Sequence, residues 1–386
     1  MGEGFGAVVL YITLFLIILV VTFLQFFSKK VTTFWFILFG IVLTSISMFR
    51  YGSGTDYFGY MMHYSLNPET IMDSIKYPSH MDMGYRVSAG IFKGFHLSFD
   101  IFIMSTSFVV MFIFLKVIKE NSKFKLLSLL IFYAVYYSIY VNSAIRQGIA
   151  MAIFFLAFYK FFKEGKTFKY LLLIILASLF HSSAVIMLLI PAIKYIHKNT
   201  FSNKILNVFL ILASLFLCLS GFSNTIISLV NISGTGASYE VTSFNPMALA
   251  LRAISVAFIL LLYKSNKRDS INEFDKLQIY VYFIGSVLFI SVANMEILSR
   301  ILEYFTLLEV ILIPNLIKGI RFKTTKIASF AFIIMLIGTL FIKDIGSFID
   351  QGNYYETNIT DYKYVTIFNK DDIYKYRIVT VPDDSY

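Results

Sequence analysis

Long apolar runs separated by short polar connections follow one another along almost the whole chain. Each run is long enough to cross, or nearly cross, the hydrocarbon core of a bilayer, which is roughly 30 Å thick. None of the connections is large enough to form a sizeable soluble domain. The pattern predicts an all-α, polytopic integral membrane protein with about twelve membrane segments. We place these segments at residues 5–27, 32–49, 97–115, 124–141, 144–162, 168–181, 182–196, 204–222, 245–263, 276–292, 299–317 and 327–342.

Composition supports this class of protein and excludes others. Hydrophobic residues make up 58% of the 386 positions, whereas soluble domains contain roughly 45 to 50%. The single cysteine, Cys218, lies inside an apolar run, which excludes a disulfide framework and a cysteine-based metal site. The first run is followed, not preceded, by Lys29 and Lys30, so we expect a retained first helix rather than a cleaved signal peptide.

The positively charged residues are concentrated on one predicted side of the membrane. The formal net charge is +10, and most basic residues lie at alternate connections, which are cytoplasmic by the positive-inside rule. The charge therefore reflects topology and does not indicate nucleic-acid binding. The clusters are Lys29/Lys30, Lys116/Lys119/Lys123/Lys125, Lys160/Lys163/Lys166/Lys169, Lys194/Lys198/Lys204, Lys264/Lys267/Arg268/Lys276 and Lys318/Arg321/Lys323/Lys326. Both termini then face outward. The alternation predicts one transmembrane domain, residues 1–343, with outer loops at 50–96 and 223–244 and an extracytoplasmic tail at 344–386.

The short apolar pair at 168–181 and 182–196 fits this alternation only as a hairpin. One continuous helix would carry lysines at both ends and would break the alternation. A hairpin keeps it and puts His181 at the outer tip. Each arm is short for a full crossing, so we expect the pair to be re-entrant or to thin the bilayer locally.

Five of the eight arginines fall on or near the outer face, against the rule that orients the protein. Arginine suits bidentate recognition of phosphate, and ionisable residues at the edges of membrane segments are functional candidates. The alternative for any one of them is a snorkelling anchor at the interface. The five are Arg50, Arg86, Arg146, Arg252 and Arg300.

The positions of these arginines within their helices favour some over others. Arg146 and Arg300 fall in first turns that face outward, where a cation opposes the helix dipole by about 0.3 to 1 kcal/mol unless an anion shares the site. Free amides at a helix N-terminus together with arginine form a phosphate cradle. Arg252 lies about two turns into its helix. Arg50 lies at an outward C-terminus, where a cation is favourable anyway, so it is the weakest candidate of the four.

Two titratable residues are candidates for acid–base chemistry. His181 is flanked by apolar helix on both sides; a lone histidine is more often structural, but the outer tip position favours a chemical role. Asp56 follows Gly52 and Gly54, whose backbone freedom lets the loop fold over the membrane surface. An ordinary Asx turn is the alternative for Asp56. Further outer-face groups without metal-site spacing are His63, His80, Asp82, Glu296 and Glu303.

Five segments, taken in order, resemble one known family. They are RYGSGTDYFGY (50–60), MDMGYRV (81–87), IRQGIAMAIFFLAF (145–158), FHSSAVIMLLIP (180–191) and RILEYF (300–305). The combination resembles the EpsG family, Wzy-like polymerases of bacterial exopolysaccharide and capsule. Asp82 departs from the family pattern, which usually has Glu there, and the role of this acid stays open.

The resemblance implies a GT-C-like helical bundle in the bacterial cytoplasmic membrane. Its activity would be that of a glycosyltransferase that joins polyprenyl diphosphate-linked oligosaccharide repeats on the outer leaflet. It implies no cofactor and no metal, and it makes membrane lipid, a flippase and a chain-length regulator the expected partners. The diphosphate would be bound by Arg50, Arg146, Arg252 and Arg300. His181 would be the catalytic base, with Asp56 as the alternate. Sugar would contact Tyr57, Tyr60, Asp82 and Tyr304.

Two other functions use similar residues. A flippase or secondary transporter for lipid-linked oligosaccharide would also need intramembrane arginines, but such proteins commonly have internal repeats and broken helices at the midplane. The sequence has no visible repeat, and its candidates gather on one face. A membrane acyltransferase acting on polysaccharide would use His181 as its base. These alternatives stay open at the level of sequence.

Overall fold

The computed structural model describes residues 7–27, 32–200, 204–220, 246–267, 270–292, 301–354 and 364–375. In these residues the protein is all-helical, and the only β pairing is two isolated bridges. Six helices are long and apolar enough to cross a membrane: Ala7–Phe27, Phe99–Asn121, Lys125–Ser143, Ile145–Phe162, Glu273–Ser291 and Lys323–Gly346. The predicted all-α membrane protein is confirmed. Shorter apolar helices account for several of the remaining predicted segments.

The chain divides into two compact units. The first contains Met1–Leu156, Leu179–Ser182 and Phe330–Tyr386, and the second contains Ala157–Ser178 and Ser183–Ser329. The sequence predicts one transmembrane domain followed by a tail from residue 344. In the structure, the helix that contains this boundary runs on to Tyr354.

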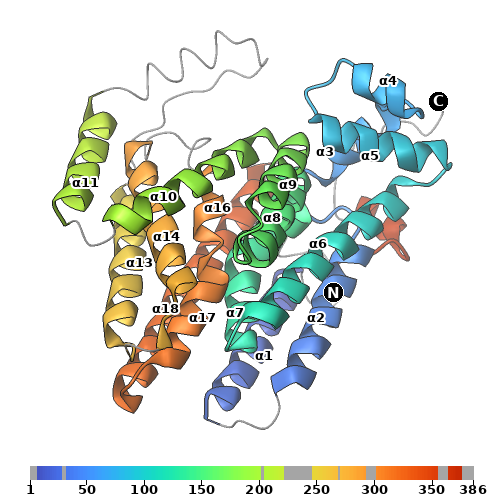
Figure 1. Ribbon diagram of the computed structural model, residues 1–386. Coiled ribbons are helices and arrows are strands. Elements are labelled where there is room, and N and C mark those ends of the chain that lie inside the picture. The colour runs from blue at the N-terminus through green and yellow to red at the C-terminus, as the bar shows by residue number, and fades with distance from the viewer. Residues whose placement is uncertain are drawn as a thin grey trace. The chain divides into compact units, whose positions relative to one another are not determined.

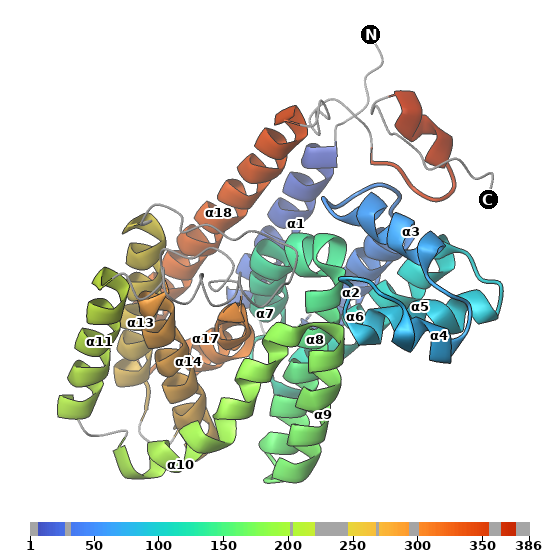
Figure 2. The same ribbon diagram turned by 90° about the horizontal axis from the view of Figure 1, so that it is seen from above.

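The first unit is built on five long helical segments. These are α1 (Ala7–Phe27), α2 (Thr32–Phe49), α6 (Phe99–Asn121), α7 (Lys125–Phe132) continued by η1 (Tyr133–Ser143), and α8 (Ile145–Leu156). The greater part of α18 (Lys323–Tyr354) lies beside α1, where Phe15 stacks on Phe341 with ring centroids 4.5 Å apart (Figure 2). The interior faces of these segments bury large apolar side chains, so packing rather than local propensity fixes their arrangement.

The segment η1 is a π-helix of 11 residues, an unusual length for a form that usually occurs as single turns. Its tyrosines tie it to two other helices, because the hydroxyl of Tyr133 donates to the carbonyl of Tyr11 and that of Tyr137 to Leu43. A Cβ at Gly148 would lie 1.6 Å from the carbonyl oxygen of Tyr140, so only glycine allows α8 this close to η1. These contacts fix the first turn of α8.

The segment 50–96, which the sequence predicts to be an outer loop and which keeps that name below, folds into three short helices: α3 (Tyr57–Leu66), α4 (Ile71–Lys76) and α5 (Met83–Gly94). They lie beyond the ends of α2 and α6 (Figure 1). Tyrosines and phenylalanines form their core, which is why the loop holds a fixed shape although it is short of aliphatic residues. The aromatic members of this core are Tyr51, Tyr57, Tyr60, Tyr64, Tyr85, Phe99 and Phe102.

The C-terminal segment 364–375 returns to the start of this outer loop. The amide of Tyr51 donates to the carbonyl of Val365 at 2.9 Å, and the amide of Ile367 donates to Phe49 at 3.0 Å. Val365 is 2% exposed and belongs to the aromatic core of the loop. Part of the C-terminal tail is therefore a structural element of the outer loop. The sequence of the tail does not predict this contact.

In the second unit, α14 (Glu273–Ser291) lies against most of the other helices. Its start is fixed by a capping box between Asn272 and Asp275. The helices are η2 (Ala157–Phe162), α9 (Thr167–Phe180), η3 (Ser182–Leu189), α10 (Ile190–Thr200), α11 (Lys204–Leu219), α13 (Pro246–Ser265), α16 (Glu303–Thr306) and α17 (Glu309–Gly319).

Two breaks between helices bear on the predicted membrane segments. Within the predicted segment 299–317, the described residues form two helices, because the helix is interrupted at Leu307 and Leu308 between α16 and α17. A break is present at His181, the predicted hairpin tip, where α9 ends and η3 begins. The predicted outer loop 223–244, Glu296 and Arg300 lie outside the described residues.

Candidate functional site

Arg146 and Asp82 form the central ion pair of the first unit. Nη1 of Arg146 lies 2.6 Å from Oδ2 of Asp82, and the side chains are 22% and 20% exposed. Arg146 is the second residue of α8, so its predicted place in a first turn is confirmed. Asp82 is the N-cap residue of α5, yet its side chain makes no capping hydrogen bond with that helix. The carboxylate instead accepts from the guanidinium.

Tyr60 adjoins this ion pair. Burial raises the pKa of the Tyr60 phenol, and the neighbouring Arg146, which is hydrogen-bonded to it, acts in the opposite direction. Tyr85 fixes the backbone of this turn, since its hydroxyl donates to the carbonyl of Tyr60 at 2.8 Å. The guanidinium of Arg146 is thus oriented by two residues of the outer loop, one a carboxylate and one a phenol.

Two histidines pair with each other near this ion pair, and one of them, His63, follows Tyr60 by three residues in α3. The rings of His63 and His80 are 4.5 Å apart between centroids and nearly perpendicular, at 86°. Burial lowers the pKa of His63, and the neighbouring His80 and Arg146 lower it further. We define the outer-loop cluster as Tyr60, His63, His80, Asp82 and Arg146. No three His, Cys, Asp or Glu side chains come together as a metal site within the described part of the chain.

The two predicted bases differ in their surroundings. The backbone just before His181 lies against the first turn of α5, since a Cβ at Gly84 would be 2.7 Å from the carbonyl oxygen of Leu179. His181 is half-buried and lies in this part of the first unit. Asp56 is exposed, and the hydroxyl of Thr55 donates to its carboxylate at 3.2 Å. It precedes α3 without capping it by its side chain.

Arg50 is fully buried, with 0% exposure. It donates to the backbone and hydroxyl of Ser47, to the hydroxyl of Ser107 at 2.7 Å and to the carbonyl of Val141 at 3.3 Å. Its guanidinium also lies 6.0 Å from the centre of the Tyr57 ring. Among the described residues no carboxylate forms an ion pair with Arg50. It therefore joins α2, α6 and η1 at the base of the outer loop.

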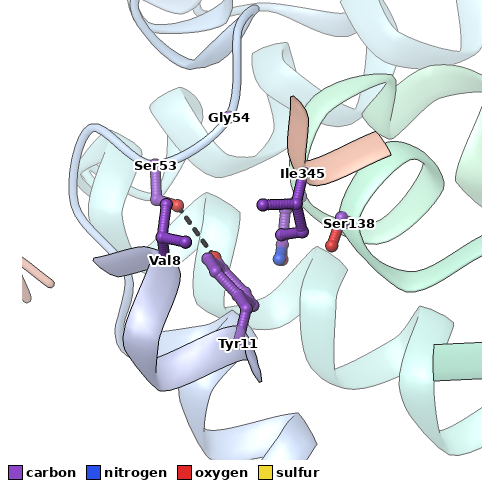
Figure 3. Close-up of a pocket in the computed structure, with 7 residues that line it drawn as sticks. Val8, Tyr11, Ser53, Gly54, Ser138 and Ile345 are labelled. Carbon is purple, nitrogen blue, oxygen red and sulfur yellow. Dashed lines mark hydrogen bonds between the residues drawn. The ribbon is translucent and has the colours of Figure 1, made fainter. Parts of the chain in front are cut away.

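A small cavity lies under the glycine turn of this loop (Figure 3). Tyr11 and Ser53 point toward each other across it, with their hydroxyls 3.1 Å apart. Gly54 has a φ of 108°, and a Cβ there would lie 2.2 Å from the carbonyl oxygen of Asn142, so the turn requires glycine. The cavity volume of about 20 Å³ suits one water molecule and is too small for a sugar.

A second ionic cluster belongs to the second unit. Nη2 of Arg252 lies 3.7 Å from Oε1 of Glu303, with exposures of 14% and 25%. The hydroxyl of Tyr282 donates to Glu309, and Arg252 acts electrostatically on both of these residues. The guanidinium also stacks over the ring of Phe289 at 4.8 Å. One cation therefore serves two carboxylates, so the cluster carries a net negative charge when both acids are ionised.

The structure brings together some of the predicted site residues and separates others. Arg146, Asp82 and Tyr60 lie together. Tyr57 and Tyr304, predicted to contact sugar, are instead fully buried at 0% exposure. The pairing of His63 with His80 and the pairing of Tyr282 with Glu309 were not predicted. One signal for the first was available, because Tyr60 and His63 are three residues apart and share a face of a helix.

One comparison with known proteins bears on this arrangement. The model of the EpsG family matches residues 32–363. The matched range contains every residue of the outer-loop cluster and of the second ionic cluster. No curated protein matches the chain, and no solved structure does.

Proposed function

The chain belongs to the EpsG family, and from this premise we propose that it is a polysaccharide polymerase. It would join polyprenyl diphosphate-linked oligosaccharide repeats on the outer face of the bacterial cytoplasmic membrane. The family match over most of an all-helical membrane protein carries the proposal. In the reaction, a hydroxyl of the acceptor sugar attacks the anomeric carbon of the donor chain. The bond from that carbon to the diphosphate oxygen breaks, and polyprenyl diphosphate leaves.

The ion pair between Arg146 and Asp82 supports this chemistry. A guanidinium held by a carboxylate and a phenol is preorganised, and its remaining donors could bind a phosphate oxygen without reorientation. Charge develops on the diphosphate as it leaves, so a fixed cation stabilises the transition state more than the ground state. We assign Arg146 to the diphosphate, Asp82 to orientation of Arg146 and to a sugar hydroxyl, and Tyr60 to holding the guanidinium.

The other three arginines predicted to bind the diphosphate are supported to different degrees. Arg252 remains a proposed phosphate contact in the second unit, although the carboxylates of Glu303 and Glu309 oppose an anion there. Arg300 remains a proposal from the resemblance alone. Because Arg50 is fully buried, we assign it to support of the outer loop rather than to the substrate. Sugar contact by the buried Tyr57 or Tyr304 would require the surrounding chain to move.

We propose the twelve-segment topology with both termini outside. The motivation is the alternation of lysine clusters together with the helices at the predicted segments. An impermeant thiol reagent applied to intact cells should label Glu69→Cys in the outer loop and leave Lys166→Cys unlabelled. Both positions are exposed on the protein, so the side of the membrane alone decides which one reacts. Cys218 is buried and gives a silent background. Labelling of Lys166→Cys from outside would overturn this topology.

The activity is tested by reconstitution of the purified protein into liposomes with a polyprenyl diphosphate-linked repeat unit. Longer lipid-linked chains support a polymerase. Exchange of the substrate between leaflets without elongation would assign a flippase, and transfer of an acyl group from an added acyl donor would assign an acyltransferase. Arg321→Lys, an exposed change in another connection, serves as the matched control for arginine variants in this assay.

A further inference from the structure

The two histidines of the outer-loop cluster lie outside the buried aromatic core of the loop, and His63 is near enough to Arg146 to be affected by its charge. His63 belongs to α3 and is half-buried. His80 lies in the connection between α4 and α5 and is exposed. A pair at the rim of a packed core can be reached by a sugar, whereas the phenol of Tyr60, at 4% exposure, cannot.

The charges around His63 favour its neutral form. His80 faces it from the connection before α5, and Arg146 faces it from α8. Its own helix contains no acid, and Asp56, which precedes that helix, is seven residues away, about 10 Å along the axis. The acid of the cluster, Asp82, is paired with Arg146. Burial and the two neighbouring basic groups hold the pKa of His63 below its usual value. The ring is therefore unprotonated at neutral pH and able to accept a proton.

The cluster joins the two groups that the proposed reaction needs. Arg146 offers a fixed cation for the leaving diphosphate, and a neutral imidazole in its vicinity offers a base for the acceptor. We propose that His63 accepts the proton of the acceptor sugar hydroxyl and that His80 positions His63 and sets its protonation. This inference rests on the proposed polymerase function and replaces His181 and Asp56 as the base.

The step balances as a nucleophilic displacement. The acceptor oxygen forms a bond to the anomeric carbon while its proton passes to a ring nitrogen of His63. The bond from the anomeric carbon to the diphosphate oxygen breaks, and its electron pair leaves with the diphosphate, whose charge Arg146 stabilises. The imidazolium then returns its proton to water, which restores the neutral base for the next addition.

The test is the rate of chain elongation in proteoliposomes across pH 5 to 8. His63→Gln should lower kcat by roughly 10²- to 10⁴-fold, as expected for a lost general base, with little change in KM for the lipid-linked donor. It should also remove the acidic limb of the pH profile. His80→Gln should keep most of the rate and move that limb to higher pH, because it removes a group that lowers the pKa of His63.

His96→Asn is the matched control. His96 follows the far end of α5, about 18 Å along the helix axis from Asp82, and asparagine tolerates its positive φ of 55°. Its rate and pH profile should equal those of the wild type. His63→Ala should regain part of its rate with added imidazole, which separates loss of the base from misfolding. Wild-type rates and an intact acidic limb in His63→Gln would overturn the inference and leave the polymerase standing. Failure of the wild type to elongate any chain would overturn both.

Discussion

Nη1 of Arg146 and Oδ2 of Asp82 are 2.6 Å apart although the residues are separated by 64 positions in the chain. The contact ties the first turn of α8, within a candidate membrane span, to the N-cap residue of α5 in the outer loop. A loop attached in this way moves with the helix, so the carboxylate and the guanidinium keep their mutual orientation. Such fixed orientation is what distinguishes a substrate site from scattered surface charges.

Replacement of Arg146 by lysine should reduce elongation by roughly 10²- to 10³-fold, comparable to loss of one donor to a developing oxyanion. Lysine keeps the charge but lacks the planar fork that holds Asp82 and a phosphate oxygen together. The measurement is chain length against time in proteoliposomes at matched protein amounts, with Arg321→Lys as control. Normal elongation by Arg146→Lys would reduce Arg146 to an anchor of the loop.

Gly84→Ala should destabilise the protein and lower its activity. A Cβ at Gly84 would lie 2.7 Å from the backbone oxygen of Leu179 and 3.0 Å from the Phe180 ring, and overpacking of this kind costs about 1 to 3 kcal/mol. Gly59→Ala is the control, because a Cβ at this helical position has no atom within 4 Å. The apparent melting temperature in detergent should fall for the first variant and hold or rise for the second. Equal melting temperatures would show that α5 does not depend on this approach to Leu179 and Phe180.

Val365→Asp should loosen the outer loop. Val365 is 2% exposed in the aromatic core, so a carboxylate there would be buried without a designed partner. Phe368→Asp places the same side chain at a position that is 77% exposed, three residues further along the same segment. Limited proteolysis from the outer face should cut residues 50–96 faster in the first variant than in the second. Identical digestion patterns would mean that the C-terminal segment is not needed for the loop.

The fold class and much of the local arrangement could be predicted from the sequence. Long apolar runs predict the helices, and the position of Arg146 after a polar break predicts its place in a first turn. The family resemblance is confirmed by the match over residues 32–363. Local patterns of this kind carry information over one or two helical turns.

The rest depends on contacts between distant residues. The burial of Arg50 results from Ser107 and Val141, which reach it from α6 and η1, and no pattern near residue 50 encodes them. The break between α16 and α17 falls in the mainly apolar stretch 301–317, where hydropathy alone predicts one helix. Val365 reaches the outer loop across more than 300 positions. Tertiary packing decides each of these features.

The cluster around Arg252 gives a final prediction, which compares two ion pairs of different length. The pair of Arg252 with Glu303 is 3.7 Å long and mostly buried, whereas the pair of Lys276 with Glu273 is 2.6 Å long with 82% exposure of the glutamate. Water screens the charges of the exposed pair. We therefore expect the longer, buried pair to have the larger coupling free energy. Double-mutant cycles with Arg252→Gln and Glu303→Gln should give a coupling of about 0.5 to 3 kcal/mol in thermal stability.

The single variant Arg252→Gln should be the most harmful in this cycle, because it leaves the carboxylates of Glu303 and Glu309 near each other without their cation. Adding Glu303→Gln should restore part of the melting temperature, since it removes one of the two repelling charges. The parallel cycle with Lys276→Gln and Glu273→Gln should show additive effects. Additivity in both cycles would mean that Arg252 gains nothing from Glu303 and is available to an anionic substrate, which would strengthen its proposed contact with the diphosphate.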